Sequence, residues 1–460
     1  MWRFLRENSY TVGFLILWLV VAKYAALLMY VLLPLGVILL RRIDRWQDIL
    51  FGFIMVLVLS DAGLEFPGML VFKSAKSTYI LVLALILFVD QARMYPLARL
   101  FTLFLPFFFY AMFPIIRNET PLVSAEKTLS YALLFLVVPN YVLYNFRLYK
   151  WDFFRNLVWF LVFVLVSQQL LPYFGNTELF YLGGRFRGWF GNPNGMAIFT
   201  FLTLVLFTVV NHLHRGLFTR WEVLFIQAVL FYYIITCGAR TSLMSSLMFL
   251  MFIQFFRIST ALGIISFVAF IGITELLASN LPYIITSLGL EEYMRVDTIA
   301  SGSGRYVAWN YAWEQINARG DLLFGAGFEH EYNVFYAAWR YLSSLGHQGG
   351  VHNSYLALWL NVGLVGLFLY FRSFVLAFIK AAKNTSMALA AMFSVLFSII
   401  YESWLAGSLN PYTILLLVIL TMMSEDEIIG SLSETGVTTE ETTVEETPGP
   451  EPQPLILPAR

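Results

Sequence analysis

Apolar residues form long runs along nearly the whole chain, separated by short polar segments. The runs approach the roughly 20 residues that an α-helix needs to cross a bilayer. They predict fourteen membrane-spanning helices, and because several runs are short, twelve spans are an alternative. The runs cover residues 9–22, 24–40, 48–60, 78–92, 97–116, 128–146, 156–173, 193–211, 221–237, 241–257, 259–279, 353–371, 385–402 and 410–424.

The composition supports a membrane protein. Of the 460 residues, 59% are hydrophobic and 13% are charged, whereas a soluble domain carries roughly 25% charged residues. The net charge of zero gives no indication of a nucleic-acid partner. The single cysteine, Cys237, excludes an intrachain disulfide and a cysteine-based zinc cluster. We therefore expect an all-α, polytopic transmembrane bundle whose first apolar run is retained as an uncleaved span.

Positive charge is unevenly distributed between the two ends of these spans. With the N-terminus in the cytoplasm, sixteen lysines and arginines lie at cytoplasmic ends and eight in the short loops on the other side. The sixteen are Arg3, Arg6, Arg41, Arg42, Arg45, Arg93, Arg99, Arg147, Lys150, Arg155, Arg215, Arg220, Arg257, Arg372, Lys380 and Lys383. The eight are Lys23, Lys73, Lys76, Arg117, Lys127, Arg185, Arg187 and Arg240. This bias predicts that the long polar segment faces outward.

Four parts follow from this pattern. Residues 1–278 form a first set of membrane helices, and 279–352 form a large helical extracytoplasmic loop with the expected catalytic role. Residues 353–424 form the last helices, and 425–460, rich in Glu, Thr, Ser and Pro, are expected to be a disordered cytoplasmic tail.

In the loop, Ser301-Gly302-Ser303-Gly304 offers backbone donors and a cap for a helix that starts near Arg305. The apolar face of that helix is expected to comprise Tyr306, Trp309, Trp313 and Ile316, and to lie on the bilayer or on neighbouring helices.

Three arginines are expected near the outer surface, namely Arg187, Arg240 and Arg305. A lone arginine there is equally well explained by contact with lipid headgroups. Three on one side favour an anion site, because the guanidinium fork matches phosphate oxygens and keeps its charge at any physiological pH. Downstream of Arg187, Asn192 is explained as a helix cap before Pro193. Asn194 and the nearby glycines are not, and a close approach to a ligand is the other interpretation.

Of the five histidines, His352 has the clearest chemical potential. It precedes a span, and a helix N-terminus disfavours imidazolium, so a neutral ring able to accept a proton is expected. A polar residue at the membrane interface is the alternative. His330 and His347 are expected on the loop surface. A metal site built from these three histidines is disfavoured by their uneven spacing and the lack of a clear carboxylate partner.

Together these segments resemble the O-antigen ligase and O-antigen polymerase superfamily of bacterial envelope glycosyltransferases. The matching segments cover roughly residues 180–370 and run in the order of that family. They are Gly184-Arg185-Phe186-Arg187-Gly188-Trp189-Phe190-Gly191-Asn192-Pro193-Asn194, Gly238-Ala239-Arg240-Thr241, Gly304-Arg305 with Leu323-Phe324-Gly325-Ala326-Gly327, and His352-Asn353-Ser354-Tyr355-Leu356 with Gly363-Leu364-Val365-Gly366. One departure is Gly-Ala before Arg240, where a serine is usual in the family.

The resemblance implies a GT-C-like fold in the bacterial inner membrane, with the active site at the periplasmic face. It implies an inverting transfer of a glycan from undecaprenyl pyrophosphate to an acceptor hydroxyl, without a metal, cofactor or nucleotide sugar. Residues matching Arg240 and Arg305 would hold the pyrophosphate, and His352 would handle the acceptor proton. The substrate-binding candidates are Arg187, Asn192, Asn194, Asn353 and Tyr355. Glu402, near the end of a late span, is a further carboxylate that could orient His352 or bind sugar.

Several functions remain open at this stage. A ligase would use lipid A core as the acceptor, a polymerase another lipid-linked repeat unit, and some relatives glycosylate proteins. A flippase or transporter of the same lipid-linked glycan is an alternative, although such proteins tend to show paired repeats and broken helices. A peptidoglycan-type polymerase is another, and it would be favoured by a catalytic carboxylate within the large loop.

Overall fold

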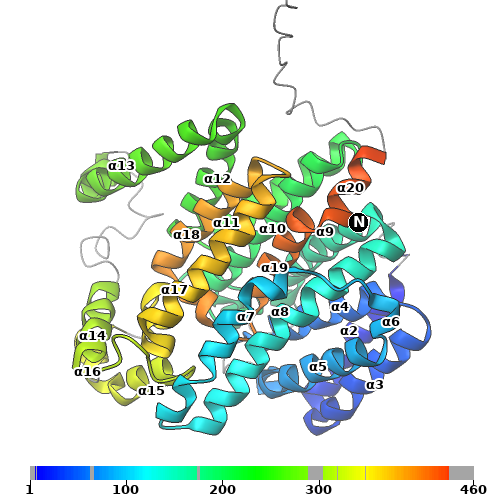
Figure 1. The fold of residues 1–460 in the computed structure, drawn as a ribbon, viewed down its shortest axis with the longest axis horizontal. Coiled ribbons are helices and arrows are strands. Elements are labelled where there is room, and N and C mark those ends of the chain that lie inside the picture. The colour runs from blue at the N-terminus through cyan, green and yellow to red at the C-terminus, as the bar shows by residue number, and fades with distance from the viewer. Residues whose placement is uncertain are drawn as a thin grey trace, which may run out of the picture.

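The structure, a computed structural model, describes residues 6, 8–62, 67–173, 177–287, 304–318, 320–347 and 349–434 of the chain. Within these residues it is an all-α bundle with one two-stranded hairpin (Figure 1). The first half contains α2 (Ser9–Tyr24), α3 (Met29–Arg42), α4 (Trp46–Ser60), α5 (Leu70–Val89), α6 (Gln91–Met94), α7 (Leu100–Ala111), α8 (Pro121–Tyr149), α9 (Trp151–Ser167), β1 (Tyr181–Leu182), β2 (Arg185–Phe186) and α10 (Pro193–Leu213). The second half contains α11 (Arg220–Thr236), α12 (Arg240–Ile258), α13 (Thr260–Ser287), α14 (Arg305–Ala318), α15 (His330–Ala337), α16 (Trp339–Ser344), α17 (Ser354–Ala382), α18 (Met387–Tyr401), α19 (Pro411–Ser424) and α20 (Asp426–Glu434).

Each of the fourteen predicted runs corresponds to a helix. Seven helices in the described part are long and apolar enough to span a membrane, and five shorter apolar helices accompany them. Every residue of α4 and of α19 is buried. A helix that is apolar on all sides and buried on all sides belongs at the centre of a bundle, and α19 packs against α8, α10 and α17. The protein is therefore a polytopic membrane protein built around these central helices.

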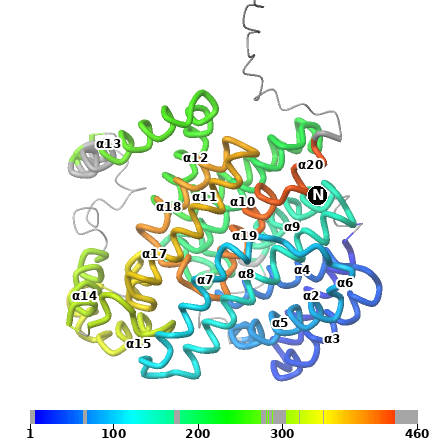
Figure 2. Tube along the Cα trace, viewed as in Figure 1, coloured from blue at the N-terminus to red at the C-terminus, as the bar shows by residue number. Residues whose placement is uncertain are grey.

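Figure 2 shows α14 and α15 gathered at one end of the bundle. We call this the loop end, and the other the opposite end. Asn118, at the loop end, donates from Nδ2 to Ala326 O at 2.7 Å, and Arg117 Nη2 lies 3.0 Å from Asp321 Oδ1. Asp321 Oδ2 also lies 3.1 Å from His330 Nε2. These contacts anchor the described part of the large loop to the start of α8.

The large loop is also joined to α17 by backbone hydrogen bonds on either side of Gly363, and we call this contact the Gly363 seam. There α17 is interrupted, with φ 67° and ψ −177° at this residue. The interruption exposes backbone groups that pair with the loop: Leu364 N donates to Leu322 O at 3.0 Å and Gly327 N to Asn361 O at 2.6 Å. A Cβ on Gly363 would lie 2.4 Å from Leu323 O, so only glycine fits both this conformation and this contact.

Two boundaries of the predicted parts change within the described residues. Residues 426–434, expected in the disordered tail, form α20, which buries Ile428 and is held by the ion pair between Arg147 and Glu427 at 2.8 Å. The start of the predicted loop is still helical, since α13 continues to Ser287. Ser301, Gly302 and Ser303 lie outside the described residues, as do residues 435–460.

The face of α14 that packs against the protein shares Ile316 with the predicted apolar face. It comprises Ala308, Ala312 and Ile316, whereas Tyr306 and Trp313 are exposed. Small alanines four residues apart allow α14 to pack closely against α17, and this contact places Arg305, the first residue of α14, at the bundle surface.

Candidate functional site

A group of polar side chains meets at the loop end around Glu402, the residue that follows α18. Its carboxylate Oε1 accepts from Arg305 Nη2 at 2.8 Å and from Asn194 Nδ2 at 2.9 Å. The side chains of Glu402 and Arg305 are 11% and 20% exposed, so this ion pair is mostly shielded from solvent. Arg305 also lies over the ring of Tyr401, 5.8 Å from its centroid. Three segments far apart in the sequence are thus joined by one carboxylate.

His352 lies on the other side of the same carboxylate. Its Nδ1 is 3.8 Å from Glu402 Oε2, which is within ion-pair distance but too long for a hydrogen bond. The backbone of His352 has φ +48°, an uncommon value for a residue with a side chain. Asn353 follows and caps α17 by accepting from Leu356 N at 3.0 Å. Ser354 then donates to Glu402 O at 2.7 Å, so the start of α17 is fixed against Glu402.

The Nε2 side of His352 is approached by the backbone of Gly349. A Cβ on Gly349 would lie 2.8 Å from His352 Nε2, and Gly349 itself has φ +113°. A larger residue there would crowd the ring nitrogen that points away from Glu402. The glycine therefore keeps this nitrogen accessible.

Arg185 connects Asn194 to the start of α12. The turn of the β1–β2 hairpin uses Gly183 and Gly184, both at positive φ, and this turn places Arg185 at the start of β2. Arg185 Nη2 donates to Asn194 Oδ1 at 2.6 Å, and its Nε donates to Cys237 O at 2.6 Å. Cys237 leads into the turn at Gly238 before α12, which begins at Arg240.

Arg240 is half-buried. Helix α12 packs along α18, which ends at Tyr401 next to Glu402. The turn before α12 contacts Arg185, which in turn contacts Asn194. The structure therefore brings Arg240 to the same end of the bundle as Arg305 and His352, and its role in holding a diphosphate stays a prediction.

Other predicted ligand residues have local structural contacts. Arg187 is 3% exposed and donates from Nε to Leu179 O at 3.0 Å and from Nη1 to Gly191 O at 3.3 Å, so it holds its own loop together. Asn192 caps α10 by accepting from Gly195 N at 2.8 Å. Tyr355 stacks on Phe371 with ring centroids 4.8 Å apart. The substrate-binding roles of these residues stay predictions.

Two further titratable groups of the loop flank His352. His347 is 2% exposed rather than on the surface as predicted, and its ring centroid lies 5.7 Å from that of His352. Burial and the neighbouring His352 lower the pKa of His347, which keeps this ring neutral near pH 7. Burial raises the pKa of Glu331, whose Oε1 accepts from Val351 N at 3.0 Å. His330 is also buried, at 3% exposure, because it pairs with Asp321.

The sequence did not mark Glu402 as the centre of this site, nor Arg185 as its link to α12. The signal for Glu402 was a single carboxylate at the end of an apolar run. Arg185 lies in a motif already noted, two residues before the arginine that was chosen. In the described part of the chain, no three His, Cys, Asp or Glu side chains are grouped as metal ligands would be.

Compared with known proteins, the chain matches no family model and no curated protein.

Proposed function

We propose that the chain is a membrane glycosyltransferase of the O-antigen ligase and polymerase type, with a GT-C-like fold. It would move a glycan from undecaprenyl pyrophosphate to an acceptor hydroxyl at the periplasmic face of the bacterial inner membrane. The observation that carries the proposal is the shared carboxylate of Glu402, which links Arg305, Asn194 and His352 at the loop end. Three of these four residues come from the segments that resemble the family.

The chemistry of the donor fits a site rich in arginine. When the bond between the anomeric carbon and the phosphate oxygen breaks, negative charge grows on the leaving diphosphate. Fixed guanidinium groups in a partly buried site stabilise such charge strongly. Arg305 has five N–H donors, and its pairing with Glu402 engages Nη2. Its other donors can hold phosphate oxygens, with Arg240 as the second cation.

The acceptor hydroxyl must lose its proton as the new glycosidic bond forms. A neutral His352 would take this proton on Nε2, while Nδ1 faces the Glu402 carboxylate 3.8 Å away. The carboxylate would then stabilise the imidazolium. One displacement at the anomeric carbon inverts its configuration. Lipid A core and a lipid-linked repeat unit are the acceptors that we favour over protein.

The test compares surface polysaccharide in cells that carry His352→Ala, Arg305→Ala or Arg340→Ala. Arg340 lies exposed on the same loop and serves as the matched control. We expect the first two variants to lose the polysaccharide and the control to retain it, at equal amounts of membrane-inserted protein. Wild-type polysaccharide in a correctly inserted His352→Ala or Arg305→Ala variant would exclude the assigned roles.

A further inference from the structure

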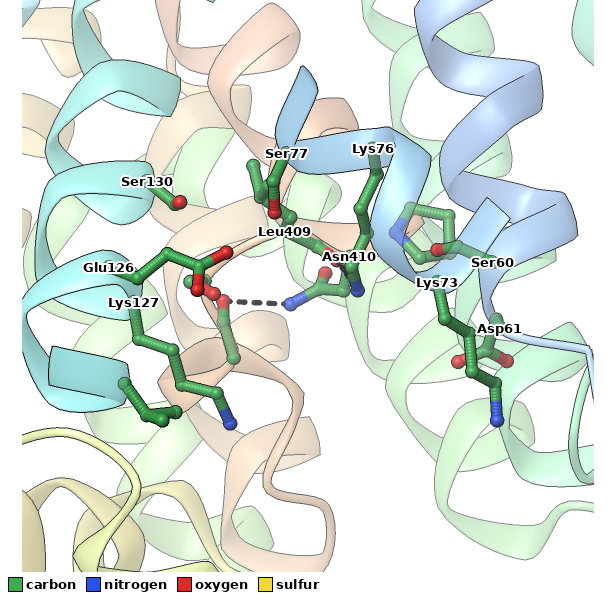
Figure 3. Close-up of a pocket in the computed structure, with 14 residues that line it drawn as sticks. Ser60, Asp61, Lys73, Lys76, Ser77, Glu126, Lys127, Ser130, Leu409 and Asn410 are labelled. Atoms are coloured by element: carbon green, nitrogen blue, oxygen red, sulfur yellow. Dashed lines mark hydrogen bonds between the residues drawn. The ribbon is translucent and has the colours of Figure 1, made fainter. Parts of the chain in front are cut away.

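A polar pocket opens at the loop end and is lined by residues other than those of the Glu402 site (Figure 3). Its volume is about 380 Å³, within the range of small-molecule sites. It lies between the end of α4, the starts of α5 and α8, and the loop before α19. The charged residues that line it are Asp61, Lys73, Lys76, Glu126 and Lys127. Ser60, Ser77, Ser130 and Asn410 add polar groups.

Three lysines line this one pocket. Lys76 interacts electrostatically with both Lys73 and Lys127, and these repulsions are opposed by Asp61. Among the described residues, no carboxylate pairs directly with Lys73 or Lys76. Lys76 instead donates to Leu409 O at 2.9 Å. Ammonium groups brought together without a paired carboxylate favour a bound anion.

Of the two carboxylates that line the pocket, Asp61 accepts from other donors, and Glu126 is exposed to solvent. Asp61 Oδ2 accepts from Tyr412 OH at 3.0 Å and from Gly191 N at 3.3 Å. Lys127 is paired with Glu329 of the large loop. Lys73 and Lys76 are therefore the two cations with capacity for an incoming oxyanion.

The pocket shares its scaffold with the Glu402 site. The loop from Glu402 to Pro411 contributes Glu402 at one end and lines the pocket from Gly407 onward. Likewise the loop before α10 touches Asp61 through Gly191, and the first turn of α10 touches Glu402 through Asn194. Asn410 holds this loop rigid, since it donates to Trp404 O at 2.8 Å and accepts from Thr413 N at 2.7 Å. A ligand in the pocket would thus be held in a fixed position beside the Glu402 site.

We propose that this pocket binds an oxyanion carried by a sugar, a phosphate ester or a carboxylate, with Lys73 and Lys76 as its cationic partners. The volume exceeds that of the oxyanion alone, and the serine hydroxyls of Ser77 and Ser130 suit the hydroxyls of a sugar ring. If the proposed function holds, this sugar would be part of the acceptor, and that assignment alone rests on the proposed function. Binding itself requires no transfer.

The experiment uses the full chain in nanodiscs of uncharged lipid and measures binding calorimetrically. The probes are glucose 6-phosphate, galacturonate, glucose and inorganic phosphate. We expect the two anionic sugars to bind more tightly than glucose and than inorganic phosphate. Lys76→Gln should weaken their binding about tenfold, because a hydrogen bond to a charged group is lost. Lys73→Gln should weaken it in the same direction, and Lys23→Gln, an exposed lysine at this end outside the pocket, should leave it unchanged.

Three results would overturn the proposal. Inorganic phosphate that binds as tightly as the sugar phosphate would identify a simple phosphate site. Phosphatidylglycerol that displaces the sugar when added to the nanodiscs would identify a lipid headgroup site. Binding that is changed no more by Lys73→Gln and Lys76→Gln than by Lys23→Gln, and is abolished by Arg305→Ala, would place the anion at Glu402. Tight sugar binding in a protein without transferase activity would instead reject the proposed function and leave the pocket assignment standing.

Discussion

Removal of the Glu402 carboxylate gives the sharpest test of the site geometry. Glu402→Gln removes the negative charge but keeps one oxygen that can accept from Arg305 and Asn194, so the ion pair becomes a neutral acceptor facing a guanidinium. The guanidinium loses its charged partner while it stays 20% exposed. A hydrogen bond to a charged group contributes about 1.5–3 kcal/mol, so we expect the free energy of unfolding to fall by about 2–3 kcal/mol.

The assay is a double-mutant cycle on Glu402→Gln and Arg305→Met, read from unfolding of the purified protein in nanodiscs. If the two residues interact as described, the double variant is more stable than the sum of the single changes predicts, by about 1–3 kcal/mol. Arg340→Ala combined with Glu402→Gln is the control, and these changes should add. A coupling between Glu402 and Arg305 below about 0.5 kcal/mol, equal to that of the control pair, would refute this reasoning.

Three further predictions concern the large loop. Gly363→Ala should lower the unfolding temperature, because backbone strain alone costs about 1–3 kcal/mol and the new Cβ would meet Leu323 O at 2.4 Å. An unchanged unfolding temperature would contradict the close backbone contact between the loop and α17. Gly349→Ala should reduce transfer more than it reduces stability, since its Cβ would lie 2.8 Å from His352 Nε2; equal activity at equal protein level would contradict this placement. The lowered pKa of His347 means that the unfolded chain takes up a proton first as the pH falls below about 6.5, so wild-type stability should drop from pH 7.5 to 5.5. The His347→Gln variant should lose less stability over the same pH range. If stability falls equally with pH in the variant and the wild type, His347 does not contribute to the pH dependence.

The membrane helices were predictable because length and apolarity alone determine them. A run such as 193–211 must satisfy its backbone groups internally in lipid, and α10 occupies Pro193–Leu213. The face of α14 was not predictable from spacing. Its large aromatic residues matched a helical period, yet the close approach to α17 selects the alanine face. Packing distance, rather than hydrophobicity, decided which side is buried.

Individual residues around Glu402 could be chosen from the sequence, but the contacts between them could not. His352 and Arg305 were chosen for their chemistry, and both lie beside Glu402. Glu402 is 97 residues from Arg305 along the chain, so no local pattern could pair them. Similarly, the motif glycines Gly325 and Gly363 meet across a backbone seam that no sequence period encodes.

Product analysis of the purified protein tests the central claim most directly. A labelled oligosaccharide on undecaprenyl pyrophosphate is incubated with lipid A core or with a second lipid-linked oligosaccharide, and the products are resolved by mass spectrometry. The account predicts that the label moves intact to the acceptor, with inverted anomeric configuration and release of undecaprenyl pyrophosphate, and that His352→Ala slows this about 10²–10⁴-fold. A donor that stays intact, or that only crosses the bilayer unchanged, would contradict it.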